Sequence, residues 1–437
     1  MAFIIGVDDT DSPRGLCTTY IATELIRELR EFDLIGHPRL VRLNPNIPWK
    51  TRGNGAIALA FGRGRGRPEG AGWVAGAPVR VFRSSWPCSA DLAGVLERAE
   101  RVVLANSALS ERGTSPAVFV ARQRPPEELY TRAVREPVLV REVERLLAPG
   151  VPRRWVWRTH GARRGLIGAS AAAAWRGRRR TYELIAYRER GRWGTPRRVD
   201  YDSVLRMDRA FRTTFNNIDP VNGHVAIAPH SPCPVLMGIR ATAPDELEAA
   251  AVAVDPGETV DRYLIFASNQ GTDDHLQRMR VREVRPYTSP IISGVVSEPP
   301  RTLRGGHVFF RIRDATGELT CAAFEPTKEF RVVVRQLVPG DRVVACGGVH
   351  GRPLTLNLEK LRVARLASVR RARKPVCAAC GVVMRSRGRG RGYRCRRCGA
   401  SAGPESATPV RVGRSLREGV YEVPKCARRH LSRPIER

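Results

Sequence analysis

Lysine is nearly absent from this 437-residue chain, although the chain is strongly basic. The sequence has 75 Lys and Arg against 43 Asp and Glu, a formal net charge of +32, and only five of the basic residues are lysines. So large a surplus favours a polyanionic partner, with nucleic acid ahead of an anionic membrane surface. An arginine bias is also typical of a GC-rich genome, so the charge alone is only a moderate indication of function.

Several other features are missing. Ten cysteines are too few for a disulfide framework in a chain of this length. The N-terminus has no signal peptide, and no uncharged apolar stretch approaches 18 residues, so we expect a cytoplasmic protein without membrane spans. No Walker motif and no fixed-period repeat occur, which excludes a P-loop enzyme and a solenoid.

The length predicts two to four domains, and the first part of the chain has mixed helical and strand patterns. Residues 3–7 predict a strand that leads through a polar loop into a helix near Thr18, where a hydroxyl favours capping. The Gly/Arg/Pro-rich residues 63–78 predict a surface insertion or linker. Further helices are expected over 129–147 and 161–174, and further strands over 182–188, 224–228 and 263–267.

From about residue 285 the pattern changes to five β-like runs with a helical interval between the third and the fourth. The runs cover 289–297, 307–313, 318–324, 341–348 and 354–365, and the helix covers 328–337. This order is that of an OB barrel, a fold common in binding of single-stranded nucleic acid and tRNA. Another small β-barrel is the alternative.

Two CxxC pairs near the C-terminus form the most specific local motif. Cys377 and Cys380 are followed, after fourteen residues, by Cys395 and Cys398. Four thiolates fill the tetrahedral shell that zinc prefers and leave no open position, so the predicted zinc is structural. The segment 370–398 has eleven Lys and Arg and no acid, which favours phosphate contacts.

Three carboxylates, Asp8, Asp9 and Asp11, stand at the end of the first predicted strand. Their mutual repulsion favours a bound cation, and carboxylate oxygens before a helix suit Mg²⁺ held together with nucleotide phosphates. Gly15 would let backbone N–H groups approach a phosphate at that helix N-terminus. A solvated acidic turn is an equally weighted alternative.

Two polar segments are candidates for ligand contacts. Residues 42–55 are rich in Pro, Gly and Asn, so Lys50 and Arg52 are expected on an exposed loop. The segment 213–219 follows Asp202 and Asp208, and together they group carboxylates and amides that would suit a cationic small molecule, although a capped turn explains the pattern as well.

Taken together, these motifs resemble the archaeal isoleucine-tRNA 2-agmatinylcytidine synthetase family. The resemblance rests on the acidic segment with Gly15 and Cys17–Thr19, on the segment 42–55, and on short motifs spread nearly end to end. These motifs are Arg164–Ala169, Tyr182–Arg188, Cys233–Leu236, Asn269–Asp273, Gly306–Phe310, Cys321–Lys328, Tyr421–Glu422 and Ala427–Leu431. The 63–78 stretch does not match the family pattern.

The resemblance implies a multidomain α+β fold. Its expected parts are a kinase-like α/β domain binding ATP and Mg²⁺ (1–150), a ferredoxin-like domain binding agmatine (151–280), an OB-fold (284–367), a zinc ribbon (374–402) and a C-terminal tail (403–437). The OB-fold and the ribbon are also what the residue patterns predict.

The resemblance further implies an ATP-dependent ligase that attaches agmatine to the 2-position of the wobble cytidine of isoleucine tRNA with a CAU anticodon, so that the anticodon decodes AUA. The cytosine 2-oxo group would be phosphorylated and then displaced by the amine, with ATP ending as AMP and phosphates. No obligate protein partner is expected.

The resemblance assigns roles to individual residues. Asp8, Asp9 and Asp11 would hold Mg²⁺, Thr18 would be phosphorylated, and Gly15, Lys50 and Arg52 would contact ATP. Candidates for agmatine are Asp208, Asn216, Asn217 and Asp219, because a guanidinium and an amine require acceptors and carboxylates. The alternatives are a non-catalytic RNA-binding protein with an OB-fold and a zinc ribbon, and the same chemistry with lysine as the amine.

Overall fold

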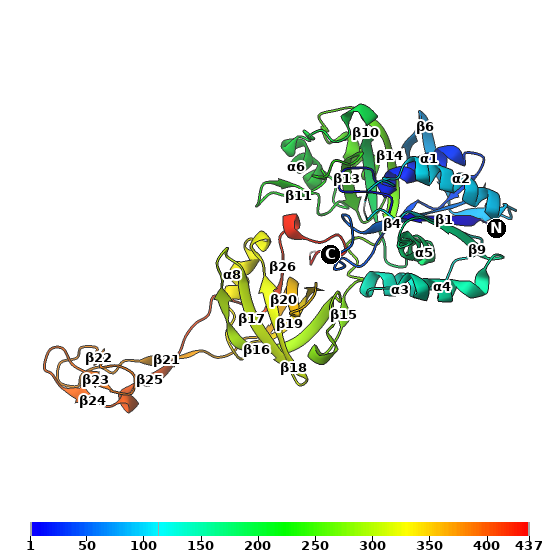
Figure 1. The fold of residues 1–437 in the computed structure, drawn as a ribbon. Helices are drawn as coiled ribbons and strands as arrows, with labels where there is room; N and C mark the ends of the chain where they lie inside the picture. The colour runs from blue at the N-terminus through cyan, green and yellow to red at the C-terminus, as the bar shows by residue number, and fades with distance from the viewer. Residues whose placement is uncertain (1, 112, 436–437) are drawn as a thin grey trace.

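The computed structural model describes residues 2–111 and 113–435. Figure 1 shows a large α/β body, a β-barrel beside it, and a small lobe at the end of a narrow two-stranded stalk. Hydrophobic residues pack into separate cores in the body, the barrel and the small lobe.

Within the described residues, one twelve-stranded sheet runs through the whole α/β body. Its main order is β13-β10-β14-β5-β6-β2-β4-β1-β8-β9, with β3 paired to β14 and β4 and with β7 paired to β4. The strands are β1 (Phe3–Asp8), β2 (Asp33–Ile35), β3 (Arg39–Arg42), β4 (Gly55–Arg65), β5 (Glu69–Val74), β6 (Ala77–Phe82), β7 (Ser84–Trp86), β8 (Ala117–Ala121), β9 (Trp155–Thr159), β10 (Thr181–Arg188), β13 (Val235–Ala241) and β14 (Val260–Ser268).

Helices cover both faces of this sheet around β1, which explains why β1 is apolar throughout. Ile5 and Val7 pack against α1 (Thr18–Glu28) and α2 (Leu92–Ala105) on one face, whereas Ile4 packs with α3 (Glu127–Arg135), α4 (Val140–Leu147) and α5 (Gly165–Ala174) on the other. Successive side chains of a strand point to opposite faces of the sheet, so β1 contacts both helical layers. Its last residue, Asp8, lies at the end of this central strand.

The prediction of an insertion or linker over 63–78 is wrong. These residues form the end of β4, all of β5 and the start of β6, and β5 pairs with β14, so the segment joins the two halves of the sheet. Gly72, at φ +150°, approaches the Tyr263 carbonyl so closely that a Cβ would lie 2.4 Å from its oxygen. The glycine content reflects this close strand contact, which composition alone does not distinguish from a loop.

Three local predictions also need correction. The helix expected over 129–147 is two helices, α3 and α4, because Pro137 and the residue before it disfavour a continuous helix. The strand expected over 224–228 shrinks to β12 (His224–Val225), which pairs with β11 (Ile218–Asp219). Thr18 begins α1, but its hydroxyl lies 2.9 Å from the Thr10 hydroxyl and does not cap the helix, whose N-cap is Cys17.

The second half of the body packs α6 (Tyr201–Ala210) and α7 (Leu247–Val252) against β10, β13 and β14. Short 3-10 turns are Ala148–Gly150 and Arg190–Arg192.

The predicted OB barrel is confirmed. Strands β16 (Pro290–Thr302), β17 (Val308–Asp314), β18 (Gly317–Ala323), β19 (Arg342–Val349) and β20 (Thr355–Arg365) follow in the expected order, with α8 (Phe330–Arg335) between the third and the fourth. The β16–β19 and β18–β20 pairings close the barrel. The small strand β15 (Gln277–Arg278) pairs with β16, and 3-10 turns span Val281–Glu283 and Glu325–Thr327.

The chain then leaves the barrel and returns to it. Strands β21 (Arg370–Arg373) and β25 (Thr408–Arg411) pair as the stalk, which carries β22 (Arg385–Ser386), β23 (Tyr393–Arg394), β24 (Ser401–Ala402) and the turn Pro404–Ser406. On the way back, β26 (Gly419–Glu422) pairs with β20, and the final segment, with the turn Lys425–Ala427, runs between the barrel and the α/β body. In the described residues, no helix has the length and apolar character needed to cross a membrane.

Substitution of Gly6 tests the packing of β1 against α5. A Cβ at Gly6 would lie 2.0 Å from the Ala169 carbonyl oxygen, so Gly6→Ala must push the helix away from the strand. We expect the unfolding free energy to fall by about 1–3 kcal/mol, measured by denaturant unfolding. Gly191→Ala is the control, because nothing lies within 4 Å of the added carbon. Equal stability of the two variants would contradict this packing.

Candidate active site

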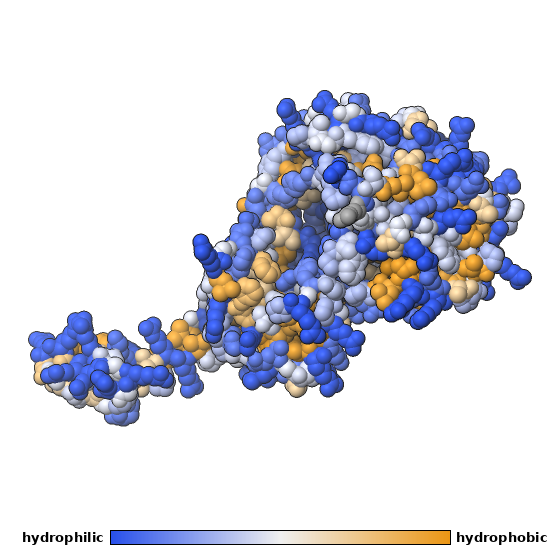
Figure 2. Space-filling model, viewed as in Figure 1, coloured by the Kyte–Doolittle hydropathy of each residue, from blue (hydrophilic) through white to orange (hydrophobic). Residues whose placement is uncertain are grey.

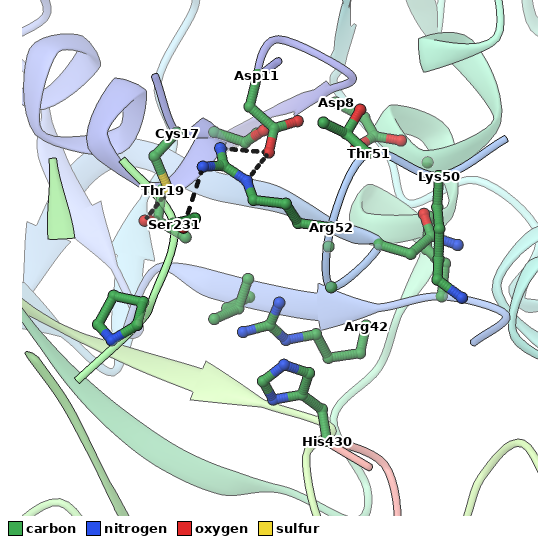
Figure 3. Close-up of a pocket in the computed structure, with 18 of the residues that line it drawn as sticks. Asp8, Asp11, Cys17, Thr19, Arg42, Lys50, Thr51, Arg52, Ser231 and His430 are labelled. Carbon is green, nitrogen blue, oxygen red and sulfur yellow. Dashed lines mark hydrogen bonds and ion pairs between the residues drawn. The ribbon is translucent and has the colours of Figure 1, made fainter. Parts of the chain in front are cut away.

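A cavity of about 390 Å³ lies between the two halves of the α/β body. Its wall combines the end of β1, the start of α1, the loop 43–54 and the beginning of α5 with side chains from β10, β13 and the C-terminal segment. Figure 3 shows these segments turned toward one space, with Asp8, Asp11, Arg52, Arg42 and His430 around it. The cavity collects residues that are up to 422 positions apart along the chain, from Asp8 to His430.

The N-terminal carboxylates form the acidic wall of this cavity. Asp8 is packed beneath α5, where a Cβ on Gly168 would lie 1.9 Å from its Oδ2. Burial, followed by the negative charge of Asp9, raises the pKa of Asp8 well above its usual value. Burial also raises the pKa of Asp9 to about 6, although Arg164, 3.9 Å away, opposes the shift. A site that raises the pKa of two carboxyl groups is one that a cation would stabilise.

Asp11 is turned toward Arg52 (Figure 3). Arg52 donates from Nε at 2.8 Å and from Nη2 at 2.5 Å to Asp11 Oδ2, and its Nη1 lies 3.3 Å from the Ser231 hydroxyl. This guanidinium therefore ties the loop 43–54 to the acidic segment and to the second half of the body. The loop expected over 42–55 is present over 43–54, because Arg42 ends β3 and Gly55 begins β4. Lys50 and Arg52, which were expected to be exposed, face the cavity and are only partly exposed.

Thr18 lines the same cavity, and Gly15 does not. The Gly15 N–H donates to the Ser12 carbonyl and the Ser12 N–H donates to the Gly15 carbonyl, so this glycine closes a tight turn next to the site. Lys50 donates to the Pro45 carbonyl, and burial together with the charge of Arg429 lowers the pKa of its amine.

The four residues predicted to bind agmatine do not line the cavity. Asn217 is fully buried and pairs its amide with the backbone N–H and carbonyl of Arg240. The other three contact the C-terminal segment: Asp219 Oδ2 accepts from the Cys426 N–H at 3.0 Å, the Asn216 amide oxygen accepts from Arg428, and Asp208 lies 3.7 Å from Lys425 Nζ.

A buried carboxylate that the sequence reasoning missed lies on the opposite wall. Glu183, on β10, lies 3.4 Å from Arg240 Nε and 3.8 Å from Arg42 Nη2, and it accepts a hydrogen bond from the Gln270 amide. The available signal was the acid itself, which interrupts an apolar strand, since a charged group is rarely fully buried without a partner. His430 was also missed, although its motif belongs to the resemblance.

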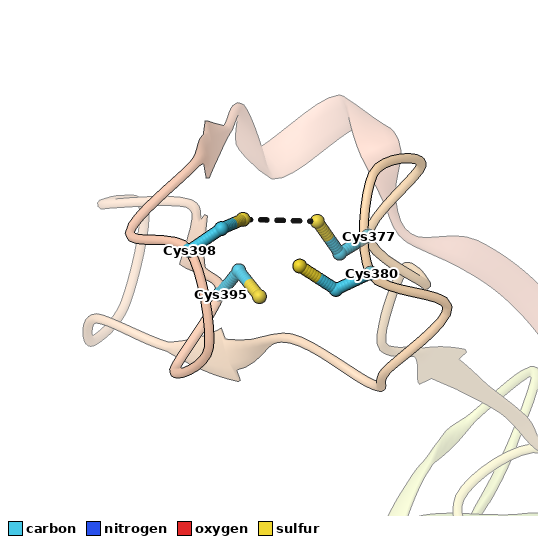
Figure 4. Close-up of side chains that lie close together, drawn as sticks. All are labelled: Cys377, Cys380, Cys395 and Cys398. Carbon is cyan, nitrogen blue, oxygen red and sulfur yellow. Dashed lines mark hydrogen bonds between the residues drawn. The ribbon is translucent and has the colours of Figure 1, made fainter.

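The predicted zinc site is well formed. The Sγ atoms of Cys377, Cys380, Cys395 and Cys398 all lie within 4.8 Å of one another, on two facing knuckles (Figure 4). An all-thiol donor set at this separation fits tetrahedral Zn²⁺ with no position left for substrate. Among the described residues, these four cysteines are the one group of three or more His, Cys, Asp or Glu side chains whose ligand atoms lie close enough together to hold a metal ion. Asp8, Asp9 and Asp11 do not converge in this way, and Asp11 pairs with Arg52.

An acid-lined cavity joined to an OB barrel and a zinc ribbon defines an enzyme that acts on nucleic acid. The family models locate these parts. The TiaS TCKD domain matches residues 4–149, the TiaS FLD domain 163–275, the OB-fold nucleic acid binding domain 291–364 and the TiaS C-terminal zinc ribbon domain 374–416.

Full-length relatives agree with the domain matches. The chain is 40% identical to the isoleucine-tRNA 2-agmatinylcytidine synthetase TiaS of Methanosarcina mazei, over 99% of this chain and 97% of the relative. It is 39% identical to that of Pyrococcus horikoshii, over 100% and 97%. This protein belongs to the isoleucine-tRNA 2-agmatinylcytidine synthetase family, and the fold predicted from the resemblance is confirmed.

Solved structures of the family superpose over the whole chain. The crystal structure of TiaS with its isoleucine tRNA and ATP matches with a TM-score of 0.85 at 37% identity, covering 100% of this chain and 97% of that one. The crystal structure of TiaS with its isoleucine tRNA, AMPCPP and agmatine matches with a TM-score of 0.82 at 34% identity and the same coverage.

The raised pKa of Asp9 gives a testable pH dependence of stability. The folded carboxyl, with a pKa of about 6, binds its proton more tightly than the unfolded one, so the unfolding free energy falls as pH rises toward 6 and stays low above it. Asp9→Asn removes this loss. We expect the variant to be more stable than the wild type by about 1–3 kcal/mol at pH 8, with the gain vanishing near pH 4, in denaturant unfolding without Mg²⁺. A variant less stable than the wild type at pH 8 would refute the interpretation.

Removal of zinc should disorder the ribbon alone. The ribbon joins the rest of the molecule through the β21–β25 stalk, so a zinc chelator should release one metal ion per chain and abolish amide-exchange protection in 374–402, while the thermal transition of the α/β body stays unchanged. We also expect tRNA affinity and its salt dependence to fall, because basic residues lose their placement. Cys380→Ser should reproduce the effect. Cys88→Ser, outside the ribbon, is the control, and an unchanged ribbon after zinc loss contradicts the assignment.

Proposed function

We propose that this chain uses ATP to attach agmatine to the 2-position of the wobble cytidine of isoleucine tRNA with a CAU anticodon. Family membership supports this proposal, as does the arrangement of the cavity, where the acidic segment and Thr18 face the same space as the buried carboxylate Glu183. The observation that carries the proposal is that one cavity brings together Asp8, Asp9, Asp11 and Thr18 with the buried polar groups of the second half of the body. A related structure contains an isoleucine tRNA, AMPCPP and agmatine together.

The chemistry requires activation before displacement, since an oxygen on the cytosine ring is a poor leaving group. We propose that Asp8, Asp9 and Asp11 bind Mg²⁺, which would neutralise phosphate charge, while Arg52, Lys50 and Gly15's turn position the nucleotide. Thr18, at the start of α1, would accept a phosphoryl group beside the carboxylates, since its hydroxyl lies 2.9 Å from that of Thr10 in the acidic segment. The wobble base must leave its stack to reach this space, so we expect it to be extruded.

Agmatine needs a carboxylate for its guanidinium. Glu183 lies on the cavity wall, but it is held between Arg42 and Arg240 and accepts from Gln270, so it positions these side chains and does not itself take the guanidinium. Direct binding by Asp208, Asn216, Asn217 and Asp219, as proposed from the sequence, would require the segment 425–428 to move aside, because three of them contact it.

The OB barrel and the ribbon would hold the tRNA. In Figure 2 the stalked ribbon is largely hydrophilic, whereas the barrel has hydrophilic and hydrophobic areas side by side. The eleven Lys and Arg of residues 370–398 give the ribbon a positive charge that suits a phosphate backbone. The zinc would be structural. We place the kinase-like domain at 1–150, the ferredoxin-like domain at 151–280, the OB-fold at 284–367, the zinc ribbon at 374–402 and the C-terminal tail at 403–437. We also propose a cytoplasmic location, where tRNA and ATP are available.

The direct test uses the complete protein with ATP, Mg²⁺, agmatine and the cognate tRNA transcript. We expect the wobble nucleoside to gain the mass of agmatine less that of water. Asp9→Ala should abolish phosphoryl transfer while tRNA affinity stays nearly intact, and Thr18→Ala should remove phosphate label from the protein. Asp245→Ala, at an exposed position outside the cavity, is the matched control.

Two results would overturn the proposal. RNA binding without ATP turnover would leave the non-catalytic alternative, in which the acidic segment is structural. Incorporation of lysine in preference to agmatine, in a competition between the two amines, would keep the chemistry and replace the substrate.

A further inference from the structure

His430 reaches the cavity from the far end of the sequence. The chain passes through the OB barrel and the zinc ribbon before the segment 425–435 returns to the α/β body. There the Gly271 N–H donates to the His430 carbonyl at 2.8 Å and the Asp273 N–H donates to the Leu431 carbonyl at 2.9 Å. The Arg433 N–H also donates to Asp273 Oδ1 at 2.7 Å. The backbone on either side of His430 is therefore fixed against the body, while its ring is exposed to the cavity.

A chain of hydrogen bonds determines which nitrogen of this ring carries the proton. Glu183, between two guanidinium groups, can only accept hydrogen bonds, so the Gln270 amide must present its NH₂ group to Glu183. The Gln270 carbonyl oxygen then faces His430 Nδ1 at 3.0 Å, and because that oxygen can only accept, Nδ1 must donate. In the neutral ring, Nε2 is left with a free lone pair.

The Nε2 side of the ring lies against other residues of the cavity wall. A Cβ placed on Gly53, in the loop 43–54, would lie 3.2 Å from Nε2. Gly53 lines the cavity next to Arg52, which pairs with Asp11. The same Cβ would lie 2.7 Å from Arg42 Nη1, so Nε2 is next to Gly53 and Arg42, and Figure 3 shows Arg42 between the His430 ring and Arg52.

The surrounding charge keeps the ring neutral. The positive charge of Arg42, then burial, then the charge of Arg240 lower the pKa of His430 well below its usual value. Glu183 is the opposing charge, and it is shared between those same two arginines. The ring is thus neutral at neutral pH and Nε2 carries no proton, while the same charges make it a weaker base than an ordinary imidazole.

We propose that His430 Nε2 accepts the proton that the attacking amine loses when it joins the cytidine. This inference rests on the proposed function. The neutral primary amine attacks C2 of the activated base and forms a C–N bond, the C2–O bond breaks, and phosphate leaves with the electron pair. The amine nitrogen, now acidic, transfers one proton to Nε2, which later releases it to solvent. Glu183 and Gln270 are positioning residues for this imidazole.

Single-turnover kinetics of the full-length protein on the tRNA transcript separate this role from a structural one. Agmatine incorporation and ATP consumption are measured in the same reaction. General-base catalysis typically contributes about 10²–10⁴-fold, so His430→Gln should slow incorporation at least about 100-fold while ATP consumption stays within about twofold of the wild type. His160→Gln, a histidine outside the cavity that pairs with Glu100, is the control.

Chemical rescue gives the second readout. His430→Ala leaves a space beside Gln270, and added imidazole should restore incorporation in proportion to its unprotonated form. Incorporation by His430→Gln at the wild-type rate, an equal loss of incorporation and ATP consumption, or a selective loss without rescue by imidazole would each overturn the proposal. A wild-type protein that incorporates no agmatine would instead refute the proposed function, so the two failures are distinguishable.

Discussion

The close approach of α5 to the end of β1 is the constraint on which the rest of the site depends. Gly6 and Gly168 let the helix backbone lie directly on the strand, which leaves the Asp8 carboxylate buried beneath the helix. Burying carboxylates beside one another is unfavourable, and Arg164 and Arg52 compensate it only in part. The site therefore has an unfavourable electrostatic energy that a cation would relieve.

Two long-range connections turn this acidic strand end into a cavity. The β5–β14 pairing continues one sheet across both halves of the body, so the acidic segment and Glu183 are placed by the same rigid element. The second connection is the segment 425–435, which pairs with Asn216, Asp219 and Asp273 and places His430 between the halves. The chain runs from β20 through the ribbon and back along β26 before it reaches this segment, so the residue that completes the cavity wall follows directly after the OB barrel and the ribbon in the sequence.

The sequence predicted features that depend on local pattern. The strand order of the OB barrel follows from alternation and turn residues, the zinc site follows from cysteine spacing, and the loop 43–54 follows from its Pro, Gly and Asn content. It failed where a residue's role is set by distant partners. The sequence around Gly72 does not show that β14 packs against it, and the sequence around Asp219 does not show that its carboxylate accepts the Cys426 N–H. Glu183, Gln270 and His430 form one network across the domains, and their sequence separation conceals it.

In the proposed reaction, the cytosine 2-oxo oxygen is phosphorylated in this cavity, and the amine of agmatine then displaces it as phosphate. The most direct test is to follow that oxygen atom, using a cognate isoleucine tRNA whose wobble cytidine contains ¹⁸O at the 2-oxo position. After one turnover with ATP and agmatine, the account predicts that the ¹⁸O is recovered in inorganic phosphate, with one labelled atom per modified base. Recovery of the label in water, in AMP or in the RNA product would contradict it.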